Sequence, residues 1–306
     1  MKYLVIIVGV LLHFIATGDT MAQTLSYNHE LIVCGWDEVF VLDLSSREQG
    51  RPQKVWRWKA AERADLPDAF KSLFNTTDEC KPFDQGRKIL ITSSGGAVAY
   101  VDRQQDRVLF YGRAANAHSA DLLPNNRIAV AASDDPEGKG DRLIVFDIEQ
   151  PDQALWSEEL PWGHGVVWDE QRQRLWALSN EDIRVYELKD WNTAAPKLVQ
   201  VSTVVLPERG GHDLYPVPDT PYLSVTTGTH CWLFDRDTKT VLLHPELAEQ
   251  AHVKSISQHP VTKQIVYVQA EGENWWAERL HFLNPEETFY FPDEHFYKAR
   301  WNIRVE

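Results

Sequence analysis

Short apolar segments recur along the chain in pairs, each pair divided by a turn, and the second member is the more strongly apolar. The pattern is clear in His118-Ser-Ala-Asp-Leu-Leu-Pro-Asn-Asn-Arg-Ile-Ala-Val-Ala. It returns in residues 79–92, 164–178, 212–225 and 254–268, and successive copies start 39 to 48 residues apart. Strand pairs at this spacing are typical of β-propeller blades, each a sheet of four antiparallel strands.

A second marker gives an independent count of blades. It is an apolar strand that ends in an acid or an amide, residue types that suit the tight turn into an outer strand. The copies are Val39–Asp43, Ala99–Asp102, Leu143–Asp147, Ile183–Glu187, Cys231–Asp235 and Leu280–Asn284. Six copies of this marker against five of the first predict that residues 295–303 supply the innermost strand of a first blade whose other strands begin near Leu31. We therefore expect a single all-β domain over residues 23–306, a six-bladed β-propeller whose closure protects its sheet edges.

One insertion breaks the period. Between Asp43 and Asp102 the spacing is 59 residues, longer than elsewhere. Within it, residues 65–74 read as a short helix with Pro67 near its first turn. We expect this helix to brace the rim of the disc.

Composition and charge narrow the class of protein. A hydrophobic fraction of 43% with 25% charged residues indicates a folded globular chain. The net charge of −14 disfavours nucleic acid and anionic lipid as partners. Lys2, the apolar run 3–15 and the small residue Ala22 predict a secretory signal peptide over residues 1–22, the alternative being an uncleaved membrane anchor. The domain after cleavage would be periplasmic or secreted, without a membrane span.

Three cysteines occur, Cys34, Cys80 and Cys231, and their spacing matches neither a zinc site nor a redox motif. We expect them to be buried structural thiols.

Candidate functional residues lie where the innermost strands begin. Aligning the blades on the second apolar strand gives equivalent positions to Glu79, His118, His164, His212, Lys254 and Lys298. These residues should form a ring around one mouth of the central channel. The alternative is that they hydrogen-bond water in a wet channel.

The loops between second and third strands open on the same face and carry Trp36, Trp275 and Trp276. These side chains suit the apolar face of a sugar ring. The alternative is that they take part in ordinary blade packing.

Three chemistries fit this ring. His118, His164 and His212, with Glu79, would hold a divalent metal. A neutral histidine would instead take a proton from the carbon beside a carboxylate, as a uronate lyase requires, while Lys254, Lys298 or Arg300 neutralises the developing charge. Binding of an anionic sugar without reaction is the third. Hydrolysis by two carboxylates is disfavoured, because Glu79 is the one acid in the aligned set and strand alternation should turn Asp213 away from the channel.

Four segments carry a family resemblance, namely 118–124, 164–169, Gly210-Gly-His-Asp-Leu-Tyr-Pro216 and Val253-Lys-Ser-Ile-Ser. Together they resemble a family of secreted bacterial propeller proteins without an assigned function. The resemblance supports the fold and the four positions His118, His164, His212 and Lys254, and it implies no activity. In architecture the ring is similar to that of propeller polysaccharide lyases acting on oligogalacturonides or ulvan, and of a propeller rhamnosidase family, whose channel mouths are rich in histidine and often hold a metal.

The leading hypothesis is an exported carbohydrate-active protein, lyase-like toward acidic, uronate-containing oligosaccharides. A propeller that binds a glycan or another partner without catalysis is the alternative, and a metal-dependent hydrolase or lactonase is a third.

Overall fold

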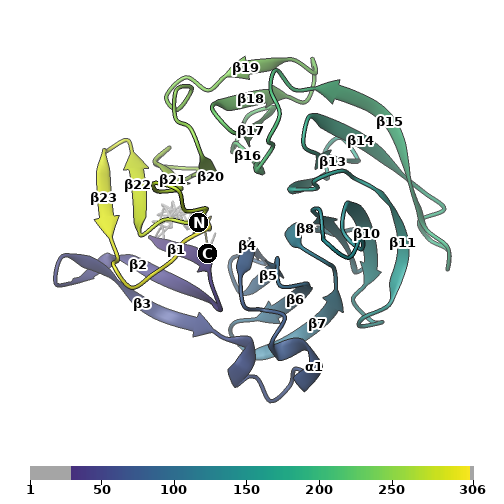
Figure 1. Ribbon diagram of the computed structural model, residues 1–306, viewed down its shortest axis with the longest axis horizontal. Coiled ribbons are helices and arrows are strands. Elements are labelled where there is room, and N and C mark those ends of the chain that lie inside the picture. Colours follow the sequence, from purple (N-terminus) through teal and green to yellow (C-terminus); the bar gives the residue numbers. More distant parts are fainter. Residues whose placement is uncertain (1–28, 304–306) are drawn as a thin grey trace, which may run out of the picture.

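The computed structural model describes residues 29–303, which form six antiparallel sheets of four strands around a central axis (Figure 1). The innermost strands are β4 (Thr77–Phe83), β8 (Ala117–Leu123), β12 (Gly165–Asp169), β16 (Asp213–Pro216), β20 (Val253–Gln258) and β24 (Lys298–Asn302). The second strands are β1 (Glu30–Gly35), β5 (Lys88–Ser93), β9 (Arg127–Ala132), β13 (Arg174–Leu178), β17 (Tyr222–Thr226) and β21 (Ile265–Gln269). The third strands are β2 (Glu38–Glu48), β6 (Ala97–Asp102), β10 (Arg142–Asp147), β14 (Asp182–Lys189), β18 (Cys231–Asp235) and β22 (Arg279–Leu283). The outer strands are β3 (Arg51–Trp58), β7 (Arg107–Arg113), β11 (Ala154–Glu159), β15 (Lys197–Val205), β19 (Val241–Leu243) and β23 (Glu287–Tyr290).

The ring closes as the sequence predicts. Strand β24, from the end of the chain, pairs antiparallel with β1, with Lys298 opposite Cys34 and Asn302 opposite Glu30. The first blade is therefore β24-β1-β2-β3, and five blades of consecutive strands follow it. Both the six-bladed propeller and its closure by the C-terminal strand are confirmed.

Apolar side chains fill the spaces between neighbouring blades. Because side chains alternate along a strand, each sheet sends one set of residues toward each neighbour. Between the second and third blades, for example, one cluster contains Val98, Phe110, Val130 and Phe146, and each of these four residues is at most 1% exposed. Burial of such clusters supplies most of the driving force for closing the disc.

The insertion contains the predicted helix in a shorter form. Helix α1 (Asp68–Lys71) begins after Pro67, and a 3₁₀ turn, η1 (Ala60–Glu62), precedes it. Phe74, just beyond α1, packs edge-on against Trp58 of β3, with ring centroids 5.1 Å apart. Phe70 packs on Tyr111 of β7. The insertion thus fastens the outer strands of two adjacent blades, as expected of a brace.

The expected signal peptide lies outside the described residues. Within residues 29–303, no helix is long and apolar enough to cross a membrane. Cys34, Cys80 and Cys231 are all buried and free, which confirms their predicted burial.

Candidate functional site

Three histidines from consecutive blades meet at one mouth of the channel. The ring of His118 stacks on that of His164 with centroids 4.1 Å apart. His164 in turn meets His212 edge-on at 5.3 Å. The row continues to the next blade, where Nζ of Lys254 lies 3.3 Å from Nε2 of His212. The sequence therefore places these four residues correctly.

The row is completed by two residues that sequence reasoning missed, Asp78 and Tyr297. The Tyr297 hydroxyl lies 3.3 Å from Nδ1 of His118, and a carboxylate oxygen of Asp78 lies 3.5 Å from the same nitrogen. Glu79 and Lys298, which the alignment assigned to the ring, lie one residue deeper along their strands. The alignment in these two blades was wrong by one residue.

In β4 the physical reason is the length of the turn that follows, because four residues separate the paired Phe83 and Lys88, whereas three separate the paired Leu123 and Arg127 in the blade of His118. A β-bulge also lies at the start of the inner strand in three blades. The register shifts between Thr77 and Glu79 in β4, and equivalent shifts lie at His118 in β8 and at Lys254 in β20. A bulge places one extra residue in the strand, so two successive side chains reach the channel. A signal in the sequence could have revealed the register. Counting from Asp78, Tyr297 and the other four members of the row, the second residue along the strand is always apolar and buried. These residues are Cys80, Ala120, Val166, Leu214, Ile256 and Ala299.

The three imidazoles are neutral at physiological pH. Burial lowers the pKa of His164 to about 4, with a smaller contribution from the charges of Lys298 and Lys254. Burial, together with the neighbouring histidine and lysine charges, also holds the pKa of His118 and His212 well below the ordinary value. The positive charges of Lys298 and Lys254 thus disfavour protonation of these rings.

Two other groups at the mouth have pKa values displaced toward neutrality. Burial raises the pKa of Asp78 to about 7. Burial and then the charge of Lys298 lower the pKa of Lys254 to about 8. The mouth therefore combines unprotonated bases with a carboxyl whose pKa is about 7 and an amine whose pKa is about 8, a combination typical of sites that transfer protons.

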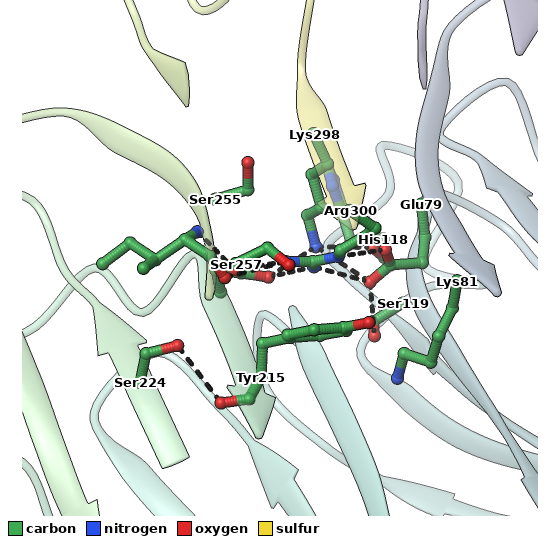
Figure 2. Close-up of polar contacts among 12 residues, drawn as sticks. Glu79, Lys81, His118, Ser119, Tyr215, Ser224, Ser255, Ser257, Lys298 and Arg300 are labelled. Atoms are coloured by element: carbon green, nitrogen blue, oxygen red, sulfur yellow. Dashed lines mark hydrogen bonds and ion pairs between the residues drawn. The ribbon is translucent and has the colours of Figure 1, made fainter. Parts of the chain in front are cut away.

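Below the mouth lies a buried cluster of four charged side chains, three of which, Glu79, Lys298 and Arg300, are labelled in Figure 2. Arg300 donates from Nε to Glu79 Oε1 at 2.9 Å and from Nη2 to Asp213 Oδ1 at 2.6 Å. Lys298 Nζ lies 3.2 Å from the same Asp213 oxygen and donates to the His118 carbonyl at 3.1 Å. We call Glu79, Asp213, Lys298 and Arg300 the ionic plug.

The ionic plug corrects two sequence predictions. Asp213 points into the channel rather than away from it, because β16 begins at Asp213 and His212 precedes the strand, so strand alternation does not relate the two residues. Lys298 and Arg300 were predicted to bind substrate, but their side chains are 0% exposed and paired with carboxylates. Both cations instead join three blades across the axis.

The metal hypothesis placed one ion among His118, His164, His212 and Glu79. Within residues 29–303, no group of three or more histidine, cysteine, aspartate or glutamate side chains is placed to hold a metal ion. The His118 and His164 rings present their faces to each other, and Glu79 accepts two hydrogen bonds from Arg300. This geometry gives the metal hypothesis no support.

The predicted tryptophans form an aromatic platform beside the histidines. Trp36 stacks on Trp275 with centroids 5.4 Å apart and planes at 12°, and Trp276 meets Trp36 edge-on. Trp36 is 40% exposed and Trp275 is 41% exposed. Trp275 also packs edge-on against Tyr297, which lies next to His118. The structure thus connects the platform to the histidine row through the buried ring of Tyr297.

Comparisons with known proteins agree with this fold. Residues 11–305 match a family model whose description is "Family of unknown function (DUF6528)". No curated protein matches the sequence. A chain from the crystal structure of a nidogen/laminin complex is similar with a TM-score of 0.57 and 12% identity, over 90% of this chain and 98% of that one. At this identity the similarity shows the fold alone.

Proposed function

The chain belongs to the DUF6528 family of unknown function, and we propose that it is an exported, carbohydrate-active propeller that cleaves acidic oligosaccharides by elimination at the histidine mouth. One observation carries this proposal: a row of neutral imidazoles ends at the amine of Lys254 and adjoins the exposed pair Trp36 and Trp275. The row offers bases and a cation, and the pair offers a flat surface for a sugar ring.

The hydrogen bonds at the mouth support one of the three histidines as the base. In neutral His164, Nδ1 can donate to the Trp162 carbonyl at 2.9 Å, which leaves the lone pair on Nε2. His212 uses its Nε2 toward Lys254. His118 directs Nδ1 to Tyr297 and Asp78, so its Nε2 is available and a carboxylate stands behind the ring to stabilise the imidazolium. Because His118 is also half-buried rather than sealed, it is the best candidate for general base.

The reaction then balances within the substrate. Nε2 of His118 takes the proton from the carbon next to the uronate carboxylate, and the electrons of that C–H bond form a carbon–carbon double bond. The bond from the adjacent carbon to the glycosidic oxygen breaks, and the imidazolium returns its proton to that oxygen. The Lys254 ammonium would neutralise charge that builds up on the carboxylate in the transition state.

An absorbance assay tests the proposal. The protein is incubated with oligogalacturonates, alginate oligosaccharides and ulvan fragments, and the ultraviolet absorbance of the new conjugated double bond is recorded. The variants His118→Asn and Asp78→Asn should lower the rate, the first by roughly 10²–10⁴-fold, as expected for loss of a general base. His281→Asn, on β22 away from the mouth, is the matched control and should retain the rate.

Binding without reaction is the second candidate function. Its support is the exposure of Trp36 and Trp275 compared with Lys254, which is 7% exposed, and His164, which is 5% exposed. If no substrate yields an absorbing product while Trp275→Ala abolishes oligosaccharide binding, the protein is a binding module.

A further inference from the structure

The opposite end of the channel holds a cavity of about 410 Å³. All six innermost strands contribute to its lining. One residue from each strand is Lys81, Asp121, Trp168, Tyr215, Ser257 and Trp301. Convergence of all six strands places this cavity on the channel axis. Its size lies within the range of pockets that bind small molecules.

The ionic plug separates this cavity from the histidine mouth. Glu79, Lys298 and Arg300 are 0% exposed and Asp213 is 1% exposed, so neither mouth leaves them open to solvent. Tyr215 underlies the plug, with Cζ of Arg300 3.9 Å from its ring centroid, and Figure 2 shows its ring lying along the network. A ligand in this cavity would therefore bind independently of one at the histidines.

The floor of the cavity is polar, and its charges are paired. Lys81 Nζ donates to Asp121 Oδ2 at 3.1 Å and to the Val166 carbonyl at 2.8 Å. An ammonium has three N–H groups, so one stays available beyond these bonds. Ser257 accepts from the Trp301 backbone N–H at 3.2 Å and keeps its own hydroxyl proton. The Tyr215 hydroxyl has no hydrogen-bond partner among residues 29–303. Because the Lys81–Asp121 pair carries no net charge, this floor gives no preference to a charged ligand.

The walls are aromatic and rigid. Trp168, Trp301 and Phe83 line the cavity together with Pro82 and Pro216. Aromatic faces beside several hydroxyl, amine and carboxylate groups are complementary to a ring that is apolar on its C–H faces and has hydroxyls around its edge. A ligand with a single hydroxyl would leave most of these groups without a partner.

We propose that this cavity is a second ligand site, which binds an uncharged sugar ring at the end of the channel opposite the histidines. The Tyr215 hydroxyl, the Ser257 hydroxyl and the Lys81 ammonium donate to the sugar oxygens, and Asp121 accepts from a sugar hydroxyl. Trp168 packs against the ring. The proposal does not depend on elimination at the histidine mouth.

Nuclear magnetic resonance of the tryptophan indole N–H groups provides the test. Signals of Trp168, Trp301, Trp36 and Trp275 are assigned with single Trp→Phe variants of the full domain. Methyl glycosides of glucose, galactose and rhamnose are the neutral probes, and the methyl glycoside of glucuronate is the acidic one. A neutral glycoside should shift the Trp168 and Trp301 signals saturably and leave those of Trp36 and Trp275 in place.

A pair of tyrosine variants locates the contact. Tyr215→Phe removes one hydroxyl from the cavity and should weaken binding about two- to tenfold, the effect of one lost hydrogen bond. Tyr297→Phe makes the same change at the opposite mouth and should leave the affinity unchanged. The proposal is overturned if no neutral glycoside shifts the Trp168 signal, if both variants weaken binding equally, or if the glucuronate glycoside binds this cavity more tightly than the neutral ones.

Discussion

The His118 ring stacks on the His164 ring with centroids 4.1 Å apart and planes at 22°. Protonating both rings would place two positive charges at that separation within a partly dry site, where Coulomb repulsion is weakly screened. The stack is therefore compatible with no more than one proton under mild conditions. This relationship connects the fold to the chemistry, because the propeller's neighbouring blades hold two bases close enough for each to suppress protonation of the other.

The first prediction concerns stability and pH. The pKa of His164 falls to about 4 on folding, from about 6.5 for an unfolded histidine. Between these values the unfolded chain binds a proton that the folded chain does not, so stability decreases as the pH drops through this window. The contribution of His164 is about 3 kcal/mol. Urea unfolding of wild type and His164→Gln at pH 7 and pH 4 measures it.

The comparison with His164→Gln is necessary because Asp78 changes the pH dependence of stability in the direction opposite to that of His164. Its pKa rises to about 7 on folding, so its protonation stabilises the folded state as the pH falls from 7 toward the ordinary aspartate value. The stability of wild type relative to His164→Gln should decrease by about 3 kcal/mol between pH 7 and pH 4. A difference that stays constant across this range contradicts the prediction.

Lys254 should lose its proton at a lower pH than an ordinary lysine does. Its pKa is lowered to about 8, so a large fraction of its amine is unprotonated at pH 8. Competitive acetylation with trace acetic anhydride over pH 6 to 11, read by peptide mass spectrometry, yields the pH of half-maximal labelling. The exposed Lys139, which pairs with Glu137 and whose pKa is raised, serves as the control. Half-maximal labelling of Lys254 near the ordinary value of about 10.4 would be inconsistent with this electrostatic account.

The repeat pattern predicts the blades because apolar positions in the sequence indicate which residues are buried. Burial can be inferred one position at a time, without knowing which strands pair. Six copies of the strand ending in Asp43, Asp102 and their equivalents are enough to count the sheets and to infer closure by residues 295–303. The alignment also predicts four of the six residues in the histidine row, namely His118, His164, His212 and Lys254, but not Asp78 and Tyr297. All of these depend on local alternation of apolar and polar residues.

The remaining features depend on pairing between strands. Asp78 rather than Glu79 joins the histidine row because the turn between the paired residues Phe83 and Lys88 is one residue longer than the equivalent turn between Leu123 and Arg127. The second cavity depends on Lys81 and Tyr215, which are 134 residues apart in the sequence and meet only when all six inner strands converge on the axis. Sequence patterning does not measure such convergence.

The aromatic platform should govern affinity for sugar. Trp275→Ala removes one member of the exposed stacked pair with Trp36 and should weaken oligosaccharide binding about tenfold or more, a loss of at least about 1.4 kcal/mol. Tyr290→Ala, a similarly exposed aromatic residue on the outer strand β23, is the control and should bind as wild type does. Calorimetric titration with oligogalacturonate measures both, and equal affinities in the two variants would rule out a role for the platform.

Arg300 should contribute to stability rather than to substrate binding. Arg300→Met keeps most of the side-chain volume but leaves the buried carboxylates of Glu79 and Asp213 with Lys298 as the remaining cation of the ionic plug. Breaking a buried ion pair from one side costs about 3–5 kcal/mol, which urea unfolding will detect. Arg47→Met removes the exposed pair with Glu287 and should cost less than about 1 kcal/mol.

A second substitution separates charge from packing at this position. If uncompensated charge causes the loss, adding Glu79→Gln to Arg300→Met should recover part of the stability, because the variant then buries one carboxylate fewer near Lys298. If packing causes it, the double variant should be no more stable than the single one. A third result would support the substrate-binding role that the sequence predicts for Arg300. In that case the Arg300→Met protein would be as stable as wild type but would no longer bind oligouronate. The guanidinium would then contact the substrate, and the ionic plug would have to open when the substrate binds.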